Sequence, residues 1–244
     1  MLSDSCKDDE KKKCLIGNSK EDYDNQLNLP INRGIPDDTY AESERFFPEW
    51  NWDEIYSYGP QVRRLPWFTN DLDSDLREEL NSRNIRGGEF LDIGTGPATQ
   101  AIQLSKLGFE VTATDISLRA IMRARTLSQD VKFITDDILD SRLSKDGYLF
   151  DYIFDRGCFH TLNPKYRSQY VTQVKKLMAR RAFFFLKTFS SKQPPGPGPY
   201  RFSVDMIREY FSKELMLLCS KETVYEGTFR VLPRALFVVM TRND

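Results

Sequence analysis

The chain of 244 residues has few histidines and cysteines, which limits the kinds of site it can form. A single histidine, His160, excludes zinc centres of the His-x-x-x-His kind, and any Ser-His-Asp or Cys-His arrangement would have to use it. The four cysteines (Cys6, Cys14, Cys158 and Cys219) form no C-x-x-C pair and are too sparse for a zinc ribbon or a disulfide scaffold. We therefore expect no metal site.

The sequence also lacks an excess of one charge and a long hydrophobic run. Lys plus Arg number 35 and Asp plus Glu number 36, so the formal net charge is −1. A nucleic-acid binder usually shows a basic excess, so this balance argues against such a partner. No stretch approaches the roughly 18 apolar residues of a membrane span, and the N-terminus lacks the apolar core of a signal peptide. We expect a cytoplasmic protein without a membrane partner.

Composition and its shifts divide the chain into three segments. Hydrophobic residues make up 40% of the chain and aromatic residues 13%, which is enough for a sizeable core. Residues 1–38 are polar and charged, with too little apolar surface to offset the entropy of ordering, so we expect a flexible tail. Residues 39–86 are aromatic and helical in pattern and predict an N-terminal helical cap, and residues 87–244 predict the main domain.

One helix of the expected cap has a clear apolar face. Leu72, Leu76 and Leu80 recur at every fourth position, which places them on one side of a helix. Asn70 or Thr69 is expected to cap its N-terminus.

Beyond residue 88 the sequence alternates between apolar strands and amphipathic helices. The expected strands are EFLDIG, EVTATD, VKFIT, LFDYIFD and RAFFFLKTF, with helices between them. This alternation predicts an α/β fold with a parallel, doubly wound, Rossmann-like sheet and helices on both faces. The last two runs, ELMLLCSKETVY and RALFVVMTR, are joined too closely for a parallel crossover. We therefore expect a seven-stranded sheet that ends in an antiparallel hairpin at its edge.

The strongest functional signal is LDIGTGPATQAI, residues 91–102. A strand ends at Asp92, and Gly94 and Gly96 let the backbone turn towards a ligand, at the end of the sheet where open α/β folds bind ligands. A dinucleotide site would need a small residue where this chain has Thr99. A carboxylate beside a glycine turn suits a cation better than a pyrophosphate, so we expect an ammonium or sulfonium ligand.

Acidic residues also follow the next two strands. Asp115 ends VTATD, where an acid can accept hydrogen bonds from two ribose hydroxyls. The alternative is that it caps the following helix, a role that Ser117 would serve equally well. The third loop, DDIL at residues 136–139, would place an acid and an apolar residue beside an adenine, although acidic loops are usually only solvated.

At these residues the chain resembles the class I S-adenosylmethionine-dependent methyltransferases, over residues 88–241. It departs from that family at Ala98, where many members have a third glycine, and at Arg180-Arg181, where Gly-Gly often precedes the fifth strand. The resemblance implies S-adenosylmethionine as cofactor, held at its methionine part by Asp92, Gly94 and Gly96, at its ribose by Asp115, and at its adenine by Asp137 with Ile138. Ile116 is a further residue expected to bind the cofactor.

A narrower resemblance extends over the N-terminal segment. WDEIY…LPWFTNDLDSDL, FDRGCFHTLNPKYRSQYV and GPYRFSVDMIREYF are similar to blocks of the thiopurine methyltransferase superfamily, which includes thiol, halide and tellurite methyltransferases. This resemblance implies that Trp67, in a Pro-Trp pair, lies over the cofactor and that the acceptor is a small, soft nucleophile. Adenine-N6 methyltransferases instead carry N/D-P-P-Y/F where this chain reads DRGC.

The catalytic candidates follow the fourth strand. Asp155 and Arg156 are expected near the sulfonium and the acceptor, Asp155 also as a cofactor ligand, or else as an ordinary ion pair of the loop. His160 can deprotonate an acceptor near neutral pH, or it makes a structural hydrogen bond. Cys158 is interpreted as a packing residue.

These observations predict an S-adenosylmethionine-dependent methyltransferase that acts on a small-molecule acceptor with a soft nucleophile such as a thiol. The alternatives are a methyltransferase of protein or nucleic acid, and a non-catalytic partner protein that binds S-adenosylmethionine. We expect a monomer or a weak dimer.

Overall fold

The structure, a computed structural model, describes residues 51–196 and 198–243. The expected flexible tail and the first part of the expected cap, residues 39–50, lie outside the described residues. The helices are α2 (Trp52–Ile55), η1 (Tyr56–Arg64), α3 (Ser74–Ser82), α4 (Thr99–Lys106), α5 (Leu118–Leu127), η2 (Ile138–Asp140), α6 (Arg142–Lys145), η3 (Phe159–Thr161), α7 (Pro164–Leu177) and α8 (Val204–Phe211). The strands are β1 (Glu89–Ile93), β2 (Glu110–Asp115), β3 (Val131–Thr135), β4 (Phe150–Arg156), β5 (Met178–Ser190), β6 (Arg201–Phe202), β7 (Leu215–Val224) and β8 (Arg234–Arg242).

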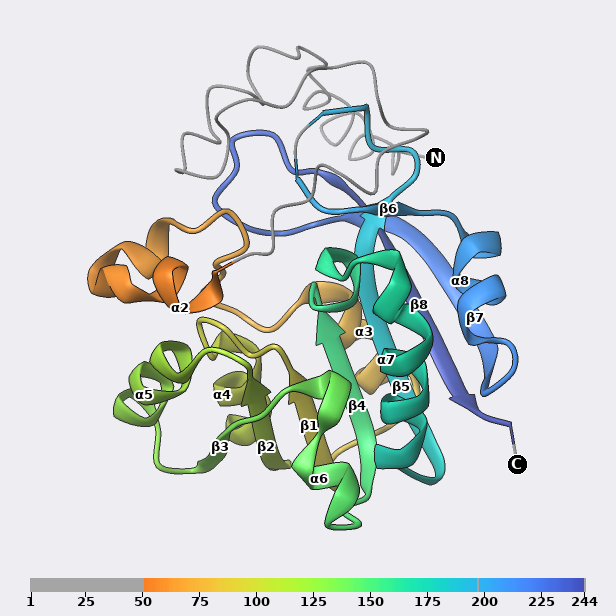
Figure 1. Ribbon diagram of the computed structural model, residues 1–244, viewed down its shortest axis with the longest axis horizontal. Coiled ribbons are helices and arrows are strands. Elements are labelled where there is room, and N and C mark those ends of the chain that lie inside the picture. The colour runs from red at the N-terminus through yellow and green to blue at the C-terminus, as the bar shows by residue number, and fades with distance from the viewer. Residues whose placement is uncertain (1–50, 197, 244) are drawn as a thin grey trace, which may run out of the picture.

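The described strands form one sheet in the order β3-β2-β1-β4-β5-β8-β7 (Figure 1). β1 to β5 are parallel to one another, whereas β8 runs antiparallel to both of its neighbours, β5 and β7. The predicted doubly wound α/β sheet and its antiparallel last pair are therefore confirmed. The two-residue strand β6, which pairs with the end of β5, is an addition that the sequence pattern did not predict.

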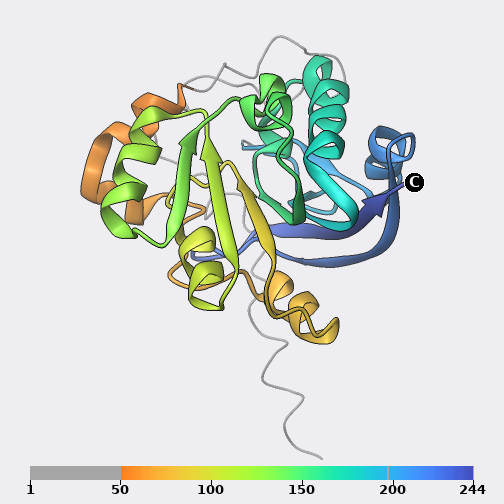
Figure 2. The ribbon, with the colours of Figure 1, turned by 90° about the horizontal axis from the view of Figure 1, so that it is seen from below.

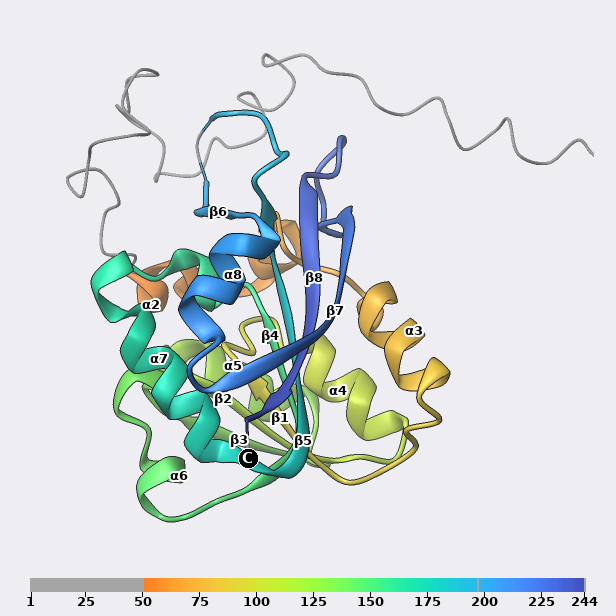
Figure 3. The ribbon, with the colours of Figure 1, turned by 90° about the vertical axis from the view of Figure 1, so that its right-hand side faces the viewer.

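Helices cover both faces of the sheet, and each face has its own apolar core. α6, α7 and α8 pack on one face, around Tyr170, Val174 and Phe211. α3, α4 and α5 pack on the other, around Leu76, Leu104 and Ile121. Figure 2 shows α3 and α7 on opposite sides of the strands, and Figure 3 shows α7 and α8 facing away from α3 and α4. In the part of the chain that the structure describes, no helix is both long and apolar enough to cross a membrane.

The N-terminal segment, residues 51–86, packs on the main domain in two places. Tyr56, Val62 and Leu65 of the η1 region pack against Ala120 of α5, near the carboxyl ends of the strands. The leucines that were expected on one face of α3 are buried in the core beneath it.

The expected cap of α3 was wrong. Asp73, rather than Asn70 or Thr69, is its N-cap, and its carboxylate accepts hydrogen bonds from the backbone N–H groups of Asp75 and Leu76. A side chain caps only from the residue directly before the first turn, and this short region offers several residues able to do so. The placement of Asp73 matters because the same carboxylate is part of the site described below.

Candidate functional site

A cavity of about 250 Å³ lies at the carboxyl ends of the parallel strands, between the N-terminal segment and the connection from β7 to β8. Its lining divides in two by strand order. One side, which we call the acidic half, follows β1, β2 and β3 and contains Asp92, Asp115, Asp136 and Asp137. The other side, which we call the aromatic half, follows β4, β5 and β7 and contains His160, Phe189, Tyr225 and Phe229.

The turn after β1 is shaped by positive backbone angles. Gly94, Gly96 and Ala98 have φ angles of 68°, 46° and 68°. A Cβ on Gly96 would lie 2.3 Å from the hydroxyl oxygen of Tyr56, so only glycine lets η1 approach the turn this closely. Ala98, at the position where the family often has glycine, adopts the left-handed conformation that glycine would take without strain.

Asp92 is buried at the end of β1 and lines the cavity. Its carboxylate accepts a hydrogen bond of 2.6 Å from the hydroxyl of Thr95. Burial raises the pKa of Asp92 to about 7, although this hydrogen bond acts in the opposite direction. Among residues 51–196 and 198–243 this carboxylate forms no ion pair, and a bound cation would stabilise its charged form.

Backbone N–H groups from two loops fix the carboxylate of Asp115 at the end of β2. Its two carboxylate oxygens accept hydrogen bonds from the N–H of Gly96 at 2.8 Å and the N–H of Ser117 at 2.9 Å. Burial raises its pKa to about 6. Ser117 is the N-cap of α5, through a hydrogen bond from the N–H of Ala120, so the helix does not need Asp115 as its cap.

The loop after β3 contributes an acidic and an apolar side chain to the cavity. Asp137 is exposed and caps η2 by accepting from the N–H of Leu139 at 2.9 Å. Ile138 lines the cavity beside it, and Ile116, from the loop after β2, lines the cavity with 56% of its surface exposed. The exposed Ile116 and the half-buried Ile138, with a carboxylate nearby, offer apolar contact and a hydrogen-bond acceptor to a planar ring.

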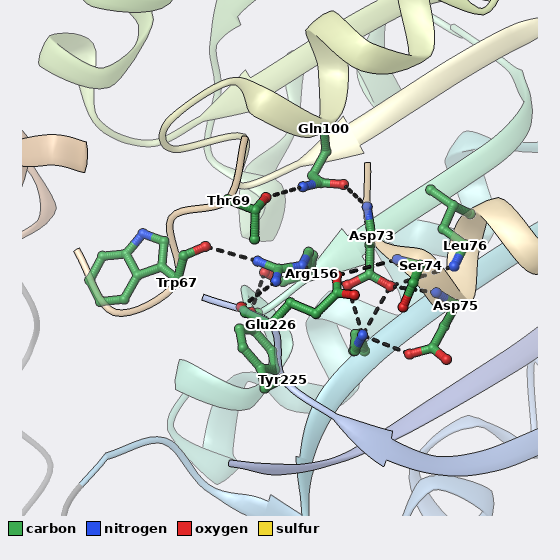
Figure 4. A network of polar contacts seen from close by, with 12 residues as sticks. Trp67, Thr69, Asp73, Ser74, Asp75, Leu76, Gln100, Arg156, Tyr225 and Glu226 are labelled. Carbon is green, nitrogen blue, oxygen red and sulfur yellow. Dashed lines mark hydrogen bonds and ion pairs between the residues drawn. The ribbon is translucent and has the colours of Figure 1, made fainter. Parts of the chain in front are cut away.

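In the aromatic half, Arg156 joins three separate segments (Figure 4). Its guanidinium donates to the carboxylate of Asp73 at 2.8 Å, to the backbone oxygen of Trp67 at 3.0 Å and to the backbone oxygen of Glu226 at 2.6 Å. The same group lies 4.6 Å from the ring centre of Tyr225. Its donors are therefore directed at the protein itself, and Arg156 fixes Trp67 and the β7–β8 connection in place.

Lys187, in the middle of β5, completes this network beneath Arg156. It is fully buried, and its ammonium donates to both carboxylate oxygens of Asp73, at 2.9 and 2.8 Å, and to Asp75 at 2.7 Å. Burial alone would raise the pKa of Asp73, but the two cations beside it hold that pKa below its usual value. Two buried cations thus share two buried carboxylates at the start of α3.

Asp155 is the predicted site residue that the structure keeps away from the cavity lining. Its carboxylate accepts from the N–H groups of Gly157, Cys158 and Phe159 and from the hydroxyl of Tyr170. These four donors hold the turn after β4 and leave little capacity for a ligand. The geometry gives no support to its predicted contacts with the sulfonium and the acceptor.

His160 lines the cavity and is almost fully buried. Its ring stacks on Tyr225 and meets the edge of Phe189. Burial, and then the charge of Arg156, lower the pKa of His160 to about 3.

Comparison with known proteins identifies the family. A model of the methyltransferase domain matches residues 90–181. An uncharacterized methyltransferase of Schizosaccharomyces pombe is 32% identical over 131 residues, which cover 50% of this chain and 89% of that protein. The chain is a member of the methyltransferase family.

Other relatives of this methyltransferase differ in what they act on. Human EEF1A lysine methyltransferase 2 is 26% identical over 155 residues, covering 56% of this chain and 65% of that protein. A structure solved for the conversion of a disulfide bond into a thioacetal group during echinomycin biosynthesis has a TM-score of 0.66 and 22% identity, covering 79% and 93% of the two chains. The 1,6-didemethyltoxoflavin-N1-methyltransferase of Burkholderia thailandensis, with bound S-adenosylhomocysteine, has a TM-score of 0.58 and 19% identity, covering 70% and 78%.

The family and the shared fold make this protein a class I S-adenosylmethionine-dependent methyltransferase, with S-adenosylmethionine as its cofactor. The narrower resemblance to the thiopurine and thiol methyltransferases stays a prediction. The structure brings most of the predicted cofactor residues to one cavity, whose lining includes Trp67, Asp92, Gly94, Asp115, Ile116, Asp137 and Ile138. Gly96 lies behind it, where its N–H holds Asp115.

Sequence reasoning missed several residues that shape the methyltransferase site. Asp73 and Tyr225 carry no local signal, because each becomes part of the site only through contacts with distant segments. Tyr56 was also missed, although the need for glycine at position 96 is explained by its hydroxyl. Lys187 did have a signal, since a lone lysine within the apolar run RAFFFLKTF implies a buried acidic partner.

Proposed function

We propose that this methyltransferase transfers a methyl group to a small molecule with a soft nucleophilic atom, such as a thiol. The observation that supports this most directly is the enclosure of the aromatic half. Trp67 and the β7–β8 connection border this half. A backbone oxygen of each accepts a hydrogen bond from the guanidinium of Arg156. The whole cavity, of about 250 Å³, is slightly smaller than the roughly 300–1,000 Å³ typical of small-molecule sites.

We place the cofactor in the acidic half. Bound S-adenosylmethionine supplies a methyl group on a sulfonium, and it also carries an ammonium and a ribose diol. Asp92 has no ion-pair partner in the described part of the chain and suits the ammonium. Each oxygen of Asp115 has one backbone donor and capacity for a ribose hydroxyl. Ile116 and Ile138 provide apolar contact for the adenine, with Asp137 as acceptor for its amino group.

We place the acceptor in the aromatic half. Its walls are mainly aromatic rings, which exclude water from a bound nucleophile and thereby favour displacement at the methyl carbon. Soft nucleophiles lose less hydration free energy on entering such a site than small, hard ones. The structural neighbour from echinomycin biosynthesis concerns sulfur chemistry, which is consistent with a sulfur acceptor.

The proposal is tested by incubating the purified protein with cofactor labelled in its methyl group. The acceptor panel contains aryl and alkyl thiols, thiopurines, halides and oxyanions, with a lysine-bearing elongation factor as the protein acceptor. We expect label in volatile or small organic products, with thiols giving the highest kcat/KM. Label found only in the protein acceptor would instead support the activity of the human lysine methyltransferase relative and would refute the small-molecule assignment.

A further inference from the structure

The imidazole of His160 is fixed in orientation by the backbone of β5. The N–H of Phe189 donates to Nδ1 of His160 at 3.1 Å. The ring plane is set by stacking on Tyr225, with centroids 5.5 Å apart, and by the edge contact with Phe189 at 5.3 Å. These contacts hold the ring of His160 in a single orientation.

This hydrogen bond determines which nitrogen of His160 carries the proton. A backbone N–H can only donate, so Nδ1 must present its lone pair, and a neutral ring then has its hydrogen on Nε2. The charged groups that face the ring include Arg156, which disfavours a second proton, as does burial. The imidazole is thus a neutral Nε2–H donor at pH 7.

The Nε2–H group is available to a molecule in the cavity. A Cβ on Gly157 would lie 2.4 Å from the hydroxyl oxygen of Tyr225 and 2.9 Å from Nε2, so only glycine lets both groups pack this closely against the turn after β4. Within residues 51–196 and 198–243 no protein group accepts a hydrogen bond from it, and His160 lines the cavity. A donor without an acceptor, among apolar rings, favours a bound group that is negatively charged.

Among the residues that the structure describes, no other side chain of the aromatic half is placed to remove a proton. The hydroxyl of Tyr225 donates to the backbone oxygen of Arg156, and burial raises the pKa of that hydroxyl. Burial also raises the pKa of the Cys158 thiol well above its usual value. Asp155 already accepts from four donors.

We propose that His160 donates a hydrogen bond from Nε2–H to the acceptor, and that the acceptor binds as an anion. A thiolate is the expected kind of acceptor. The proposal rests on the proposed function, because it assigns the acceptor to the aromatic half. In the reaction, a lone pair of the thiolate sulfur forms the bond to the methyl carbon while the carbon–sulfur bond of the sulfonium breaks. Its electron pair stays on the cofactor sulfur, which becomes a neutral thioether, and no proton moves.

The proposal narrows the substrate class. Thiols that are largely ionised at neutral pH, such as aryl thiols, should be better acceptors than alkyl thiols at the same total concentration. A lysine side chain would be a poor acceptor, since its ammonium must lose a proton before it can attack and no group of the aromatic half accepts one.

The single histidine of the chain makes a direct measurement possible. The protein is labelled with ¹⁵N-histidine, purified without a histidine tag, and examined by NMR from pH 5 to pH 9 with S-adenosylhomocysteine bound. We expect one neutral ring that is protonated at Nε2 over the whole range. Protonation at Nδ1, or a titration with a midpoint between about 6 and 7, would overturn the donor assignment.

Kinetics with two matched variants test the role in catalysis. His160→Gln places an amide donor near the position of Nε2, whereas His160→Asn places its amide oxygen near Nδ1 and has no group that reaches the cavity. We expect His160→Asn to lower kcat/KM for thiophenol roughly 10- to 100-fold, with unchanged affinity for S-adenosylhomocysteine, and His160→Gln to retain more activity. Equal losses in both variants would contradict a donor role.

The pH profile distinguishes donor from base. With 4-nitrothiophenol, thiophenol and 2-mercaptoethanol, whose thiol pKa values increase in that order, the rise of kcat/KM with pH should follow each thiol and persist in His160→Asn. A rise at one pH for all three thiols that is lost in His160→Asn would show a base and overturn the proposal. If no thiol is methylated, the proposed function and the thiolate class fail together, while the NMR result still decides the donor assignment independently.

Discussion

The side chains of the acidic half and those of the aromatic half are fixed by different kinds of contact. In the acidic half, carboxylates accept from groups in their own or adjacent loops, as Asp137 does from Leu139 and Asp92 from Thr95. In the aromatic half, Arg156 is anchored to residues 83, 89 and 70 positions away in the sequence. The acidic half is therefore a property of single βα turns, and the aromatic half is a property of the assembled fold.

This difference has consequences for stability and for binding. Hydrogen bonds between these carboxylates and nearby backbone N–H groups form as soon as each turn forms. Replacing such a carboxylate should therefore affect mainly the affinity for the ligand that contacts it. The buried charges around Lys187 and Arg156 lost their hydration on folding, and each depends on the other to offset that cost. Changes in the aromatic half should therefore destabilise the fold, whereas changes in the acidic half should weaken cofactor binding.

The largest expected effect is that of Lys187→Met. The substitution keeps an unbranched side chain in β5 but removes a cation from two buried carboxylates, and such losses cost about 3–5 kcal/mol. Lys221→Met is the matched control, because Lys221 binds the same Asp75 from the surface, with 49% of its side chain exposed. Exposed ion pairs contribute only about 0–1 kcal/mol.

Urea denaturation of both variants measures the two free energies of unfolding. If Lys187→Met lost no more stability than Lys221→Met, the claim that buried charges of the aromatic half stabilise the fold would be wrong. Affinity for S-adenosylhomocysteine, measured on the folded fraction at low temperature, should change little in either variant.

The next largest effect is expected for Asp115→Ala, in cofactor affinity rather than stability. If Asp115 accepts from both ribose hydroxyls, two hydrogen bonds are lost, and partial replacement by water should hold the loss to about 2–4 kcal/mol, or roughly 30- to 1,000-fold. Ser117→Ala is the control, because Ser117 is the cap of α5 and does not line the cavity. It should lower stability by about 1 kcal/mol and leave affinity intact.

Calorimetric titration with S-adenosylhomocysteine, together with thermal unfolding, separates the two variants. Asp115→Ala will also lose some stability, because the N–H groups of Gly96 and Ser117 lose their acceptor. The result that would remove Asp115 from the cofactor site is wild-type affinity in this variant.

The same division explains what the sequence could predict. Gly94, Gly96 and Asp115 form a pattern within one βαβ unit, and alternation of strands and helices predicted the order of the main elements. Asp73 and Tyr225 could not be found this way, because no local pattern shows which distant segment will lie over β4. Lys187 indicated a buried acid without indicating which one, and the two-residue strand β6 is too short for any periodic pattern.

A third expected effect concerns pH and the acidic half alone. If Asp92 binds the cofactor ammonium, affinity for S-adenosylhomocysteine should rise as pH increases from about 5.5 to about 8, on the order of tenfold, because the pKa of Asp92 without ligand is about 7. Methylthioadenosine, which lacks the ammonium, is the control ligand. Its affinity should rise less and at lower pH, following Asp115 with its pKa of about 6. Parallel pH dependence of the two ligands would argue against the role of Asp92.

The unliganded protein should show the opposite trend in stability. The folded-state pKa values of Asp92 and Asp115 are both above the ordinary value of 3.8, so the folded state binds more protons than the unfolded state between about pH 4 and 7. The contribution of these groups to the free energy of unfolding is therefore greatest at low pH and is lost as pH rises through about 7. Urea denaturation with and without S-adenosylhomocysteine should show slopes of different size across this window.

The smallest expected effect is that of Ala98→Gly, and it tests whether the turn of the acidic half stores backbone strain. Ala98 is fully buried with φ of 68° and ψ of 7°, a conformation that costs an L-residue about 1–2 kcal/mol. Glycine removes this cost, but it also removes a buried methyl worth about 0.8 kcal/mol and adds freedom to the unfolded chain worth about 0.4–1 kcal/mol. The net change should lie within about 1 kcal/mol of zero.

Ala101→Gly isolates the strain. Ala101 is equally buried, but it lies within the regular helix α4, whereas Ala98 is the N-cap residue before it, so glycine at position 101 gives no relief. It should lose about 2 kcal/mol, from the methyl group and from the poor helix propensity of glycine. The difference between the two variants in urea denaturation is therefore a measure of the strain at Ala98, about 1–2 kcal/mol. Equal losses in both would show that the turn after β1 is unstrained, and that the family's frequent glycine at this position has another cause.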